Sequence, residues 1–220
     1  MSSLRLVLFG PPGAGKGTQA QLLKERLGIP HISSGDLFRY HLREGTDLGQ
    51  RAAEYINQGL LVPDEVTIDI ILDQVLALSD EDGFILDGFP RTTSQAAALQ
   101  ETLQDRSRGL DKVVFINVPE EELVRRLGGR FTCQQCQTPH TVSNADPGIE
   151  LKCERCGGQL YQRPDDRPEA VRQRIEVYQR ETVPVLDFYR KLGLLADVYG
   201  VGSVECVNRR VLVALGQNLD

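Results

Sequence analysis

Near its start the chain carries a glycine-rich stretch, GPPGAGKGT, at residues 10–18. An apolar run at residues 4–9 precedes it and predicts a buried strand, and the residues that follow it predict a helix. Four residues separate Gly10 from Gly15, and Lys16 comes next, which is the spacing of a phosphate-binding loop between a strand and a helix. Glycines bring backbone N–H groups close to an anion, and a helix N-terminus adds partial positive charge. We therefore expect a phosphate site here, with Lys16 as a point charge for the outer phosphates.

The residue after the lysine separates this loop from those of GTPases and motors. In those proteins a Ser or Thr follows the lysine, and its hydroxyl binds Mg²⁺. Here Gly17 follows and Thr18 comes one position later. The sequence also contains no Lys-x-Asp motif of the kind that reads guanine. A GTPase-like switch is therefore disfavoured.

Apolar runs alternate with helical patterns along the rest of the chain. Further strands are predicted at 84–87, 112–118 and 194–200, and residues 204–207 are a candidate for pairing nearby. Helices are predicted at 36–44, 47–58, 64–78, 92–104, 119–127, 168–191 and 208–216. This alternation predicts an α/β fold, a mostly parallel sheet of the P-loop NTPase type with helices on both faces.

Two stretches interrupt the alternation. Residues 33–62 predict helices without strands, and residues 129–166 are rich in turns and hold four cysteines. We expect both to be mobile insertions on a core made of residues 1–32, 63–128 and 167–220.

The second insertion has the spacing of a metal site. Cys133 and Cys136 form one Cys-x-x-Cys pair and Cys153 and Cys156 another, with 16 residues between the pairs. Four thiolates close a tetrahedral shell, so we expect a structural zinc ion, although iron suits the same ligands. Two disulfides or four unliganded thiols are the alternatives, and a reducing cytoplasm disfavours the disulfides. His140 is an alternative ligand that we expect instead on the lid surface, and Cys206 is expected in the core.

Composition limits the classes of partner. The net charge of −6 argues against general nucleic-acid binding, and no apolar stretch approaches the roughly 20 residues that span a bilayer. A zinc-ribbon nucleic-acid binder would carry a basic ribbon with aromatic residues, whereas residues 133–162 mix acids with bases and include one tyrosine. We expect a cytoplasmic enzyme that builds its anion sites from local clusters of arginine.

Arginines recur in four further motifs, at the ends of the predicted insertions and at the end of a buried strand. These motifs are SSGDLFR (33–39), LDGFPRT (86–92), RRLGGR (125–130) and RPDDRPEAVRQR (163–174). Together with GPPGAGKGT, and in this order and spacing, they resemble the adenylate kinase family over essentially the whole chain. The long cysteine-bearing lid resembles the form of the family whose lid holds a metal.

The resemblance implies reversible phosphoryl transfer, in which Mg·ATP and AMP give two ADP. It implies that ATP is bound by Gly13, Ala14, Gly15, Lys16, Gly17, Thr18, Arg126, Arg130 and Gly202. It implies that AMP is bound by Ser34, Arg39, Leu60, Leu61, Val62, Gly88, Phe89, Pro90, Arg91, Gln95, Arg163 and Arg174. Catalysis would fall to Lys16, Arg91, Arg130, Arg163 and Arg174. Phe131, where a second arginine is frequent in the family, is a departure that weakens the expected lid contacts to ATP.

Further expectations concern the acidic residues and the partners. Asp87, with Asp36 as a second candidate, would orient hydrated Mg²⁺, whereas Asp165 and Asp166 are expected in ion pairs with arginines at the lid hinge. Five other arginines are expected on the surface, solvated or in weak ion pairs: Arg5, Arg106, Arg108, Arg209 and Arg210. The family implies a monomer that acts on ATP and AMP. A kinase for UMP or CMP, or an AMP kinase that uses GTP, remains the alternative.

Overall fold

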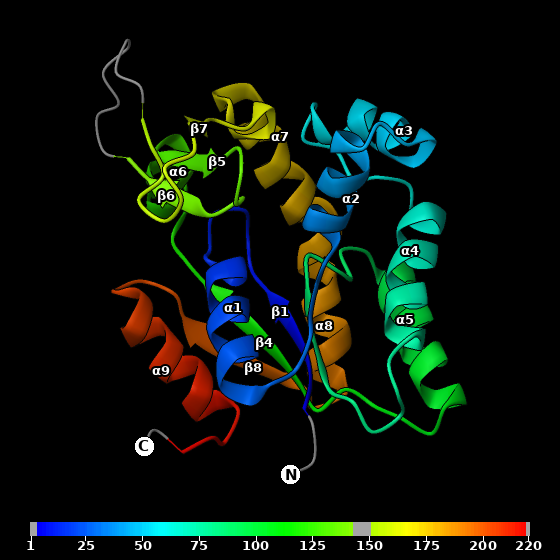
Figure 1. Ribbon diagram of the computed structural model, residues 1–220. Helices are drawn as coiled ribbons and strands as arrows, with labels where there is room; N and C mark the ends of the chain where they lie inside the picture. Colours follow the sequence, from blue (N-terminus) through cyan, green and yellow to red (C-terminus); the bar gives the residue numbers. More distant parts are fainter. Residues whose placement is uncertain (1–3, 143–150, 219–220) are drawn as a thin grey trace.

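A computed structural model describes residues 4–142 and 151–218 of the chain. Its centre is a five-stranded parallel sheet with the strand order β2-β3-β1-β4-β8, which confirms the predicted fold class. The strands are β1 (Arg5–Phe9), β2 (His31–Ser33), β3 (Phe84–Asp87), β4 (Lys112–Asn117) and β8 (Leu195–Tyr199). All five run in the same direction, so their carboxyl ends meet at one edge of the sheet (Figure 1).

Both faces of the sheet are covered by helices (Figure 1). Alternate residues of β1 face opposite ways, so Leu6 and Leu8 join one apolar core while Val7 and Phe9 join the other. The first core packs under α1 (Lys16–Leu27) and α9 (Val204–Ala214). The second packs under α4 (Asp64–Leu76), α5 (Thr93–Asp105) and α8 (Val183–Lys191). This two-sided burial explains why the strands are apolar throughout.

Two smaller units lie beyond the carboxyl ends of the strands (Figure 1). One contains α2 (Ser34–Arg43) and α3 (Asp47–Ile56). The other follows α6 (Glu120–Gly128) and is an antiparallel sheet of β5 (Arg130–Cys133), β6 (Pro139–Thr141) and β7 (Leu160–Tyr161). A 3₁₀ turn (Pro164–Asp166) and α7 (Pro168–Val177) lead back to the core. Residues 143–150 of the predicted lid lie outside the described residues.

Three sequence predictions need correction. The stretch 204–207 is the first turn of α9 and not a strand, because the Ser203 hydroxyl caps the helix by accepting from the Cys206 N–H at 3.2 Å. Cys206 is consequently exposed and not in the core. Arg108 is not a surface residue: it is 6% exposed and donates to the carbonyl oxygens of Ser79 and Asp82 at 3.0 and 2.8 Å.

The helix predicted over 168–191 is broken by a π-helical turn at Tyr178–Thr182. Pro184 stands in the first turn of α8 and has no N–H to continue the α-helical ladder, which explains why the chain widens just before it. Among the described residues no helix has both the length and the apolar character needed to cross a membrane.

Candidate active site

The glycine-rich loop connects β1 to α1 and depends on close backbone approaches. At Gly10 φ is +153°, and a Cβ there would lie 2.8 Å from the carbonyl oxygen of Ile116, so the position requires glycine. Gly13 and Gly15 also have positive φ values, +85° and +94°. Helix α1 begins at Lys16, so its first backbone N–H groups face the loop. A helix N-terminus in this position binds phosphate.

The ammonium group of Lys16 lies within this loop and donates to two of its carbonyl oxygens at 2.7 and 3.1 Å. Burial lowers the pKa of Lys16 to about 8, with further lowering by the charges of Arg91 and Arg174, while the Asp87 carboxylate opposes the effect. Several cations therefore converge on the loop, which is the charge distribution that polyphosphate binding requires.

Asp87 ends strand β3 beside the loop. Its carboxylate lies 3.6 Å from Nε2 of His31, and a Cβ at Gly17 would come within 3.4 Å of its Oδ2. Burial acts to raise the pKa of Asp87, but the neighbouring His31 ring and the charges of Lys16 and Arg91 leave that pKa below its ordinary value. Asp87 is therefore an ionised carboxylate facing the start of α1. The other candidate for magnesium, Asp36, is instead exposed and ion-paired with Arg39.

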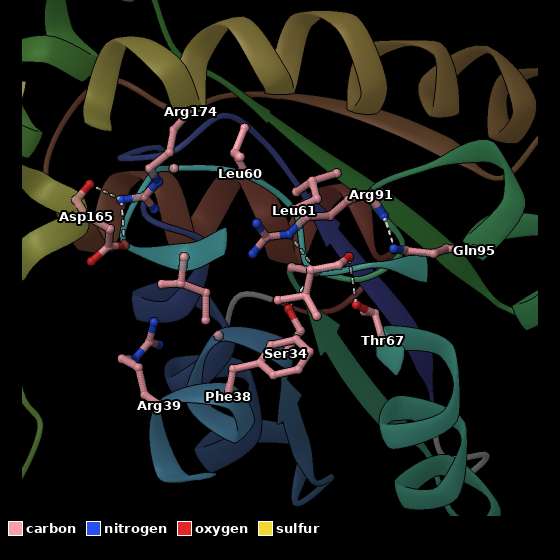
Figure 2. A pocket seen from close by; sticks show the side chains of 15 residues that line it. Ser34, Phe38, Arg39, Leu60, Leu61, Thr67, Arg91, Gln95, Asp165 and Arg174 are labelled. Atoms are coloured by element: carbon pink, nitrogen blue, oxygen red, sulfur yellow. Dashed lines mark hydrogen bonds and ion pairs between the residues drawn. The ribbon is translucent and has the colours of Figure 1, made fainter. Parts of the chain in front are cut away.

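A pocket lies between α2, the α3–α4 connection, the loop after β3, the 3₁₀ turn at Pro164–Asp166 and the second half of α7 (Figure 2). Nine of the residues expected to bind AMP line it: Ser34, Arg39, Leu60, Leu61, Val62, Gly88, Arg91, Gln95 and Arg174. Three others do not line it: Phe89, Pro90 and Arg163.

Six further residues line the pocket that sequence reasoning missed: Gly35, Phe38, Ile56, Gly59, Thr67 and Asp165. Phe38 lies four residues after Ser34 on α2, so helical spacing from a predicted contact would have found it. Thr67 has no such signal. It reaches the pocket from the first turn of α4, a helix on which no nucleotide-binding residue was predicted. The Thr67 hydroxyl donates to the carbonyl oxygen of Val62 at 3.3 Å.

The pocket is strongly charged at one end and carries uncharged side chains at the other. Figure 2 shows Arg39, Arg174 and Asp165 at one end and Thr67 and Gln95 at the opposite end. Arg91 donates through Nε to the carbonyl oxygen of Gly88 at 2.7 Å, and burial lowers its pKa to about 10. A ligand with an anionic group at one end and a flat, uncharged ring system at the other fits this distribution of charge.

The expected ion pairs at the base of the lid are present. The buried Asp166 carboxylate pairs with Arg130 of β5, and it also accepts from Arg174 of α7 at 3.0 Å. Arg174 makes a second ion pair with Asp165 at 2.8 Å. Burial, then the charges of Arg39 and Arg130, lower the pKa of Arg163 to about 10. Four of the arginines predicted to bind nucleotide thus lie in one cluster: Arg39, Arg130, Arg163 and Arg174.

Arg126 links the loop to the segment after β8. Its guanidinium donates to the carbonyl oxygens of Ala14 at 3.4 Å and Gly200 at 3.0 Å, and it pairs with Glu122 at 2.8 Å. Arg126 therefore reaches both segments expected to bind ATP, the loop and the backbone near Gly202.

Comparison with known proteins agrees with this geometry. Residues 8–194 match the model of the family described as adenylate kinase. An adenylate kinase of Caldicellulosiruptor bescii is 46% identical over 213 residues, which cover 97% of this chain and 99% of that protein. An adenylate kinase of Archaeoglobus fulgidus is 48% identical over 208 residues, covering 94% of this chain and 96% of that protein. One from Syntrophotalea carbinolica is 45% identical over 216 residues, or 98% of this chain and 100% of that protein.

The chain belongs to the adenylate kinase family. This membership confirms the expected enzyme class, a nucleoside monophosphate kinase that is an ATP:AMP phosphotransferase. It also accounts for the P-loop type of sheet. Adenylate kinases use Mg²⁺ together with ATP, and the ionised Asp87 beside the loop is chemically suited to that ion.

The four lid cysteines of this adenylate kinase form one cluster. Their sulfur atoms all lie within 4.8 Å of one another, with 3.4 Å between Cys133 and Cys156 and 3.6 Å between Cys136 and Cys153. A Cβ at Gly158 would lie 2.9 Å from the Cys133 sulfur, so the turn packs directly against the cluster. Four thiolates at this spacing fit a tetrahedral zinc ion.

His140 corrects one expectation about the lid. It was expected on the lid surface, but it is only partly exposed, and its Nε2 lies 3.2 Å from the sulfur of Cys153. The ring therefore contacts the cysteine cluster from β6, as a hydrogen-bonding neighbour of Cys153.

Proposed function

We propose that this adenylate kinase binds AMP in the pocket of Figure 2 and Mg·ATP on the glycine-rich loop, and that the γ-phosphoryl group passes between them. The observation that carries the proposal is the convergence of Arg39, Arg91 and Arg174 on a pocket next to Lys16. The charges of Arg91 and Arg174 are close enough to lower the pKa of Lys16, so one set of cations serves both sites.

AMP would lie along the pocket with its phosphate at the arginine end. Arg39, Arg91 and Arg174 would hold that phosphate, because guanidinium groups grip phosphate oxygens in pairs and stay charged. The base would lie against Phe38 and the backbone of residues 60–62, beside Gln95. Ser34 would line the middle of the site, since its hydroxyl already donates to Gly88 at 2.7 Å.

ATP would occupy the loop from Gly13 to Thr18, with its phosphates facing the N-terminus of α1. Lys16 would contact the outer phosphates, and Arg126 and Arg130 would approach from the lid side. The adenine of ATP would lie near the backbone of Gly202. Bound Mg²⁺ would neutralise phosphate charge, and Asp87 would orient its water ligands.

Phosphoryl transfer here would need positioning and charge compensation instead of a general base. The acceptor is a phosphate oxygen of AMP that is already ionised, so no proton has to be removed. Two nucleotides bring about six negative charges into one cleft, and fixed cations stabilise the charge that spreads over the transferring group. Lys16, Arg91, Arg130, Arg163 and Arg174 would supply these cations.

The wider organisation follows the same proposal. Residues 1–32, 63–128 and 167–220 would form the core, 33–62 the AMP-binding insertion and 129–166 the lid. The lid would hold one structural zinc ion on Cys133, Cys136, Cys153 and Cys156, since this donor set suits zinc. We further propose a monomeric enzyme of the cytoplasm.

The test is product analysis by ³¹P NMR with Mg·ATP and one acceptor at a time: AMP, CMP, UMP or GMP. The proposal expects ADP to form rapidly with AMP and only slowly with the others. Comparable turnover of UMP or CMP would move the acceptor to pyrimidine nucleotides, and replacing ATP with GTP in the same assay identifies the donor.

A variant connects this activity to the pocket. Arg91→Ala is expected to lower kcat/KM for AMP by about 100-fold or more, because it removes a cation that holds both the acceptor and the transferring group. Inorganic phosphate released from ATP at the same rate with and without AMP would contradict the proposal.

A further inference from the structure

We propose that Asp64 fixes the orientation of the Gln95 side-chain amide and thereby makes the AMP pocket select adenine over bases with the opposite hydrogen-bonding edge. Asp64 begins α4 and does not line the pocket, whereas Gln95 does. The inference rests on the proposed function, because it requires AMP to bind in this pocket with its base beside Gln95.

The Gln95 amide is held at both of its polar atoms. It is 1% exposed, its Nε2 donates to Oδ1 of Asp64 at 2.7 Å, and its Oε1 accepts from the backbone N–H of Arg91 at 2.7 Å. Rotating the amide by half a turn would place Oε1 against a carboxylate oxygen and Nε2 against an N–H donor. Both contacts would then be repulsive, so the amide has one permitted orientation.

Asp64 is itself fixed by the first turn of α5. Its Oδ2 accepts from the Thr92 hydroxyl at 2.7 Å, and the same hydroxyl accepts from the Gln95 backbone N–H at 3.2 Å. Because Asp64 is a carboxylate, it offers acceptors to both neighbours and no donor. Asp64 therefore favours, from the α4 side, the same orientation of the Gln95 amide that the Arg91 N–H favours from the other side.

A fixed amide distinguishes purines by their edges. An amide nitrogen has a second proton and an amide oxygen has a second lone pair, so Gln95 still offers one donor and one acceptor. Adenine complements such a pair with N1 as acceptor and its 6-amino group as donor. Hypoxanthine has the reverse pattern, N1–H as donor and O6 as acceptor, on a ring of nearly the same shape. It fits only if the amide turns over, which leaves buried polar groups unpaired.

The decisive substitution is Asp64→Asn. Asparagine has nearly the same shape as aspartate, but its own amide can turn so that either its N–H donor or its oxygen acceptor faces Gln95. The measured quantity is kcat/KM for AMP divided by kcat/KM for IMP, with Mg·ATP as the donor. Because only the Arg91 N–H then opposes the turned amide, this ratio is expected to fall by about fivefold or more relative to the wild type, through the KM values and not through kcat. The matched control is Glu65→Gln, which removes a charge from the same turn of α4 at an exposed position and should leave the ratio unchanged.

The possible outcomes separate this inference from the function on which it rests. A ratio in Asp64→Asn within about twofold of wild type, or equal losses for AMP and IMP, would show that the Arg91 N–H fixes the amide without Asp64 and would overturn the inference. Equal use of AMP and IMP by the wild type would overturn it as well, while leaving the proposed function intact. Absence of ADP formation from AMP would instead refute the proposed function. If the Asn variant does not fold, Asp64→Ala removes the acceptor from Gln95 altogether, and a fall in the ratio is again expected.

Discussion

At the scale of single residues, Arg174 and Arg172 provide an internal comparison on α7. Arg174 lines the pocket and pairs with two carboxylates, whereas Arg172 is exposed on another side of the helix. Arg174→Lys is expected to lower kcat/KM for AMP by about 100-fold, because an ammonium group cannot bridge phosphate oxygens as a guanidinium does. Arg172→Lys should leave kcat/KM unchanged, and a coupled assay of ADP formation measures both variants. If the two substitutions lowered kcat/KM for AMP equally, Arg174 would not be a phosphate-binding residue.

Lys16 makes the activity depend on pH. With a pKa of about 8 in the unliganded enzyme, Lys16 is charged below that pH and loses its proton above it. Because only the charged form attracts phosphate, kcat/KM for Mg·ATP is expected to fall as the pH rises through about 8. Bound phosphates favour the ammonium form, so the fall in kcat should come at higher pH. Lys16→Arg should abolish this decrease in kcat/KM at alkaline pH, because arginine stays charged. A decrease that persists in the variant would have to be assigned to another titrating group.

The sequence was informative about residues whose motif forms a local structure. The glycines and lysine of the loop, the cysteine pairs and the arginines at strand and helix ends could all be placed from spacing and resemblance. Asp64 could not, since its role depends on a contact between the first turns of α4 and α5, 31 residues apart. Arg108 was missed for a related reason, as its partners Ser79 and Asp82 lie on a turn that only the folded chain brings near.

At the scale of elements, the lid sheet is short and carries the cysteine cluster in which we propose a zinc ion. The strands β6 and β7 contain three and two residues, too few to be stable as an isolated sheet. Cys133→Ser is therefore expected to lose bound zinc and to lower the melting temperature by about 5 °C or more. Cys206→Ser, at an exposed cysteine outside the cluster, should retain both. Metal analysis and calorimetry measure the two effects, and unchanged melting of the zinc-depleted protein would contradict a structural role.

His140 should affect how long the lid retains the proposed zinc ion. A ring N–H donated to the Cys153 sulfur stabilises the thiolate and holds it in position. Replacing His140 with Phe is expected to speed zinc transfer to a colorimetric chelator by about tenfold, while His140→Gln, which keeps a donor, should have a smaller effect. Equal release rates for wild type and the Phe variant would mean that the contact has no influence on the metal.

Two elements show why the sequence could not specify every strand and helix. β2 was not predicted because it has three residues, His31–Ser33, and only Ile32 is buried. It becomes a strand because β3 offers it a parallel partner, with Ile32 opposite Leu86. Residues 204–207 carry apolar side chains like a strand, yet the Ser203 cap and a place beside α1 make them helical. In both cases a neighbour distant in sequence outweighs local composition.

At the scale of the whole molecule, the lid and the core meet at the buried carboxylate of Asp166. This group pairs with Arg130 at the start of the lid sheet and with Arg174 on α7, next to the pocket. Closure of the lid over ATP and binding of AMP would therefore act on one cluster of charges. An enzyme that brings ATP beside an acceptor must also exclude water, and the lid is the element placed to do so.

Removing the distal lid tests this function directly. Thr132 and Tyr161 are paired across β5 and β7, so residues 133–160 can be replaced by Asn-Gly, a two-residue hairpin turn, while Arg130 and Arg163 remain. The shortened enzyme is expected to transfer phosphate to AMP about 100-fold more slowly, and a larger share of the ATP consumed should appear as inorganic phosphate. ³¹P NMR measures ADP and inorganic phosphate in one experiment. If transfer stayed at the wild-type rate and the share of inorganic phosphate did not rise, water exclusion would have to be assigned to the core and not to the lid.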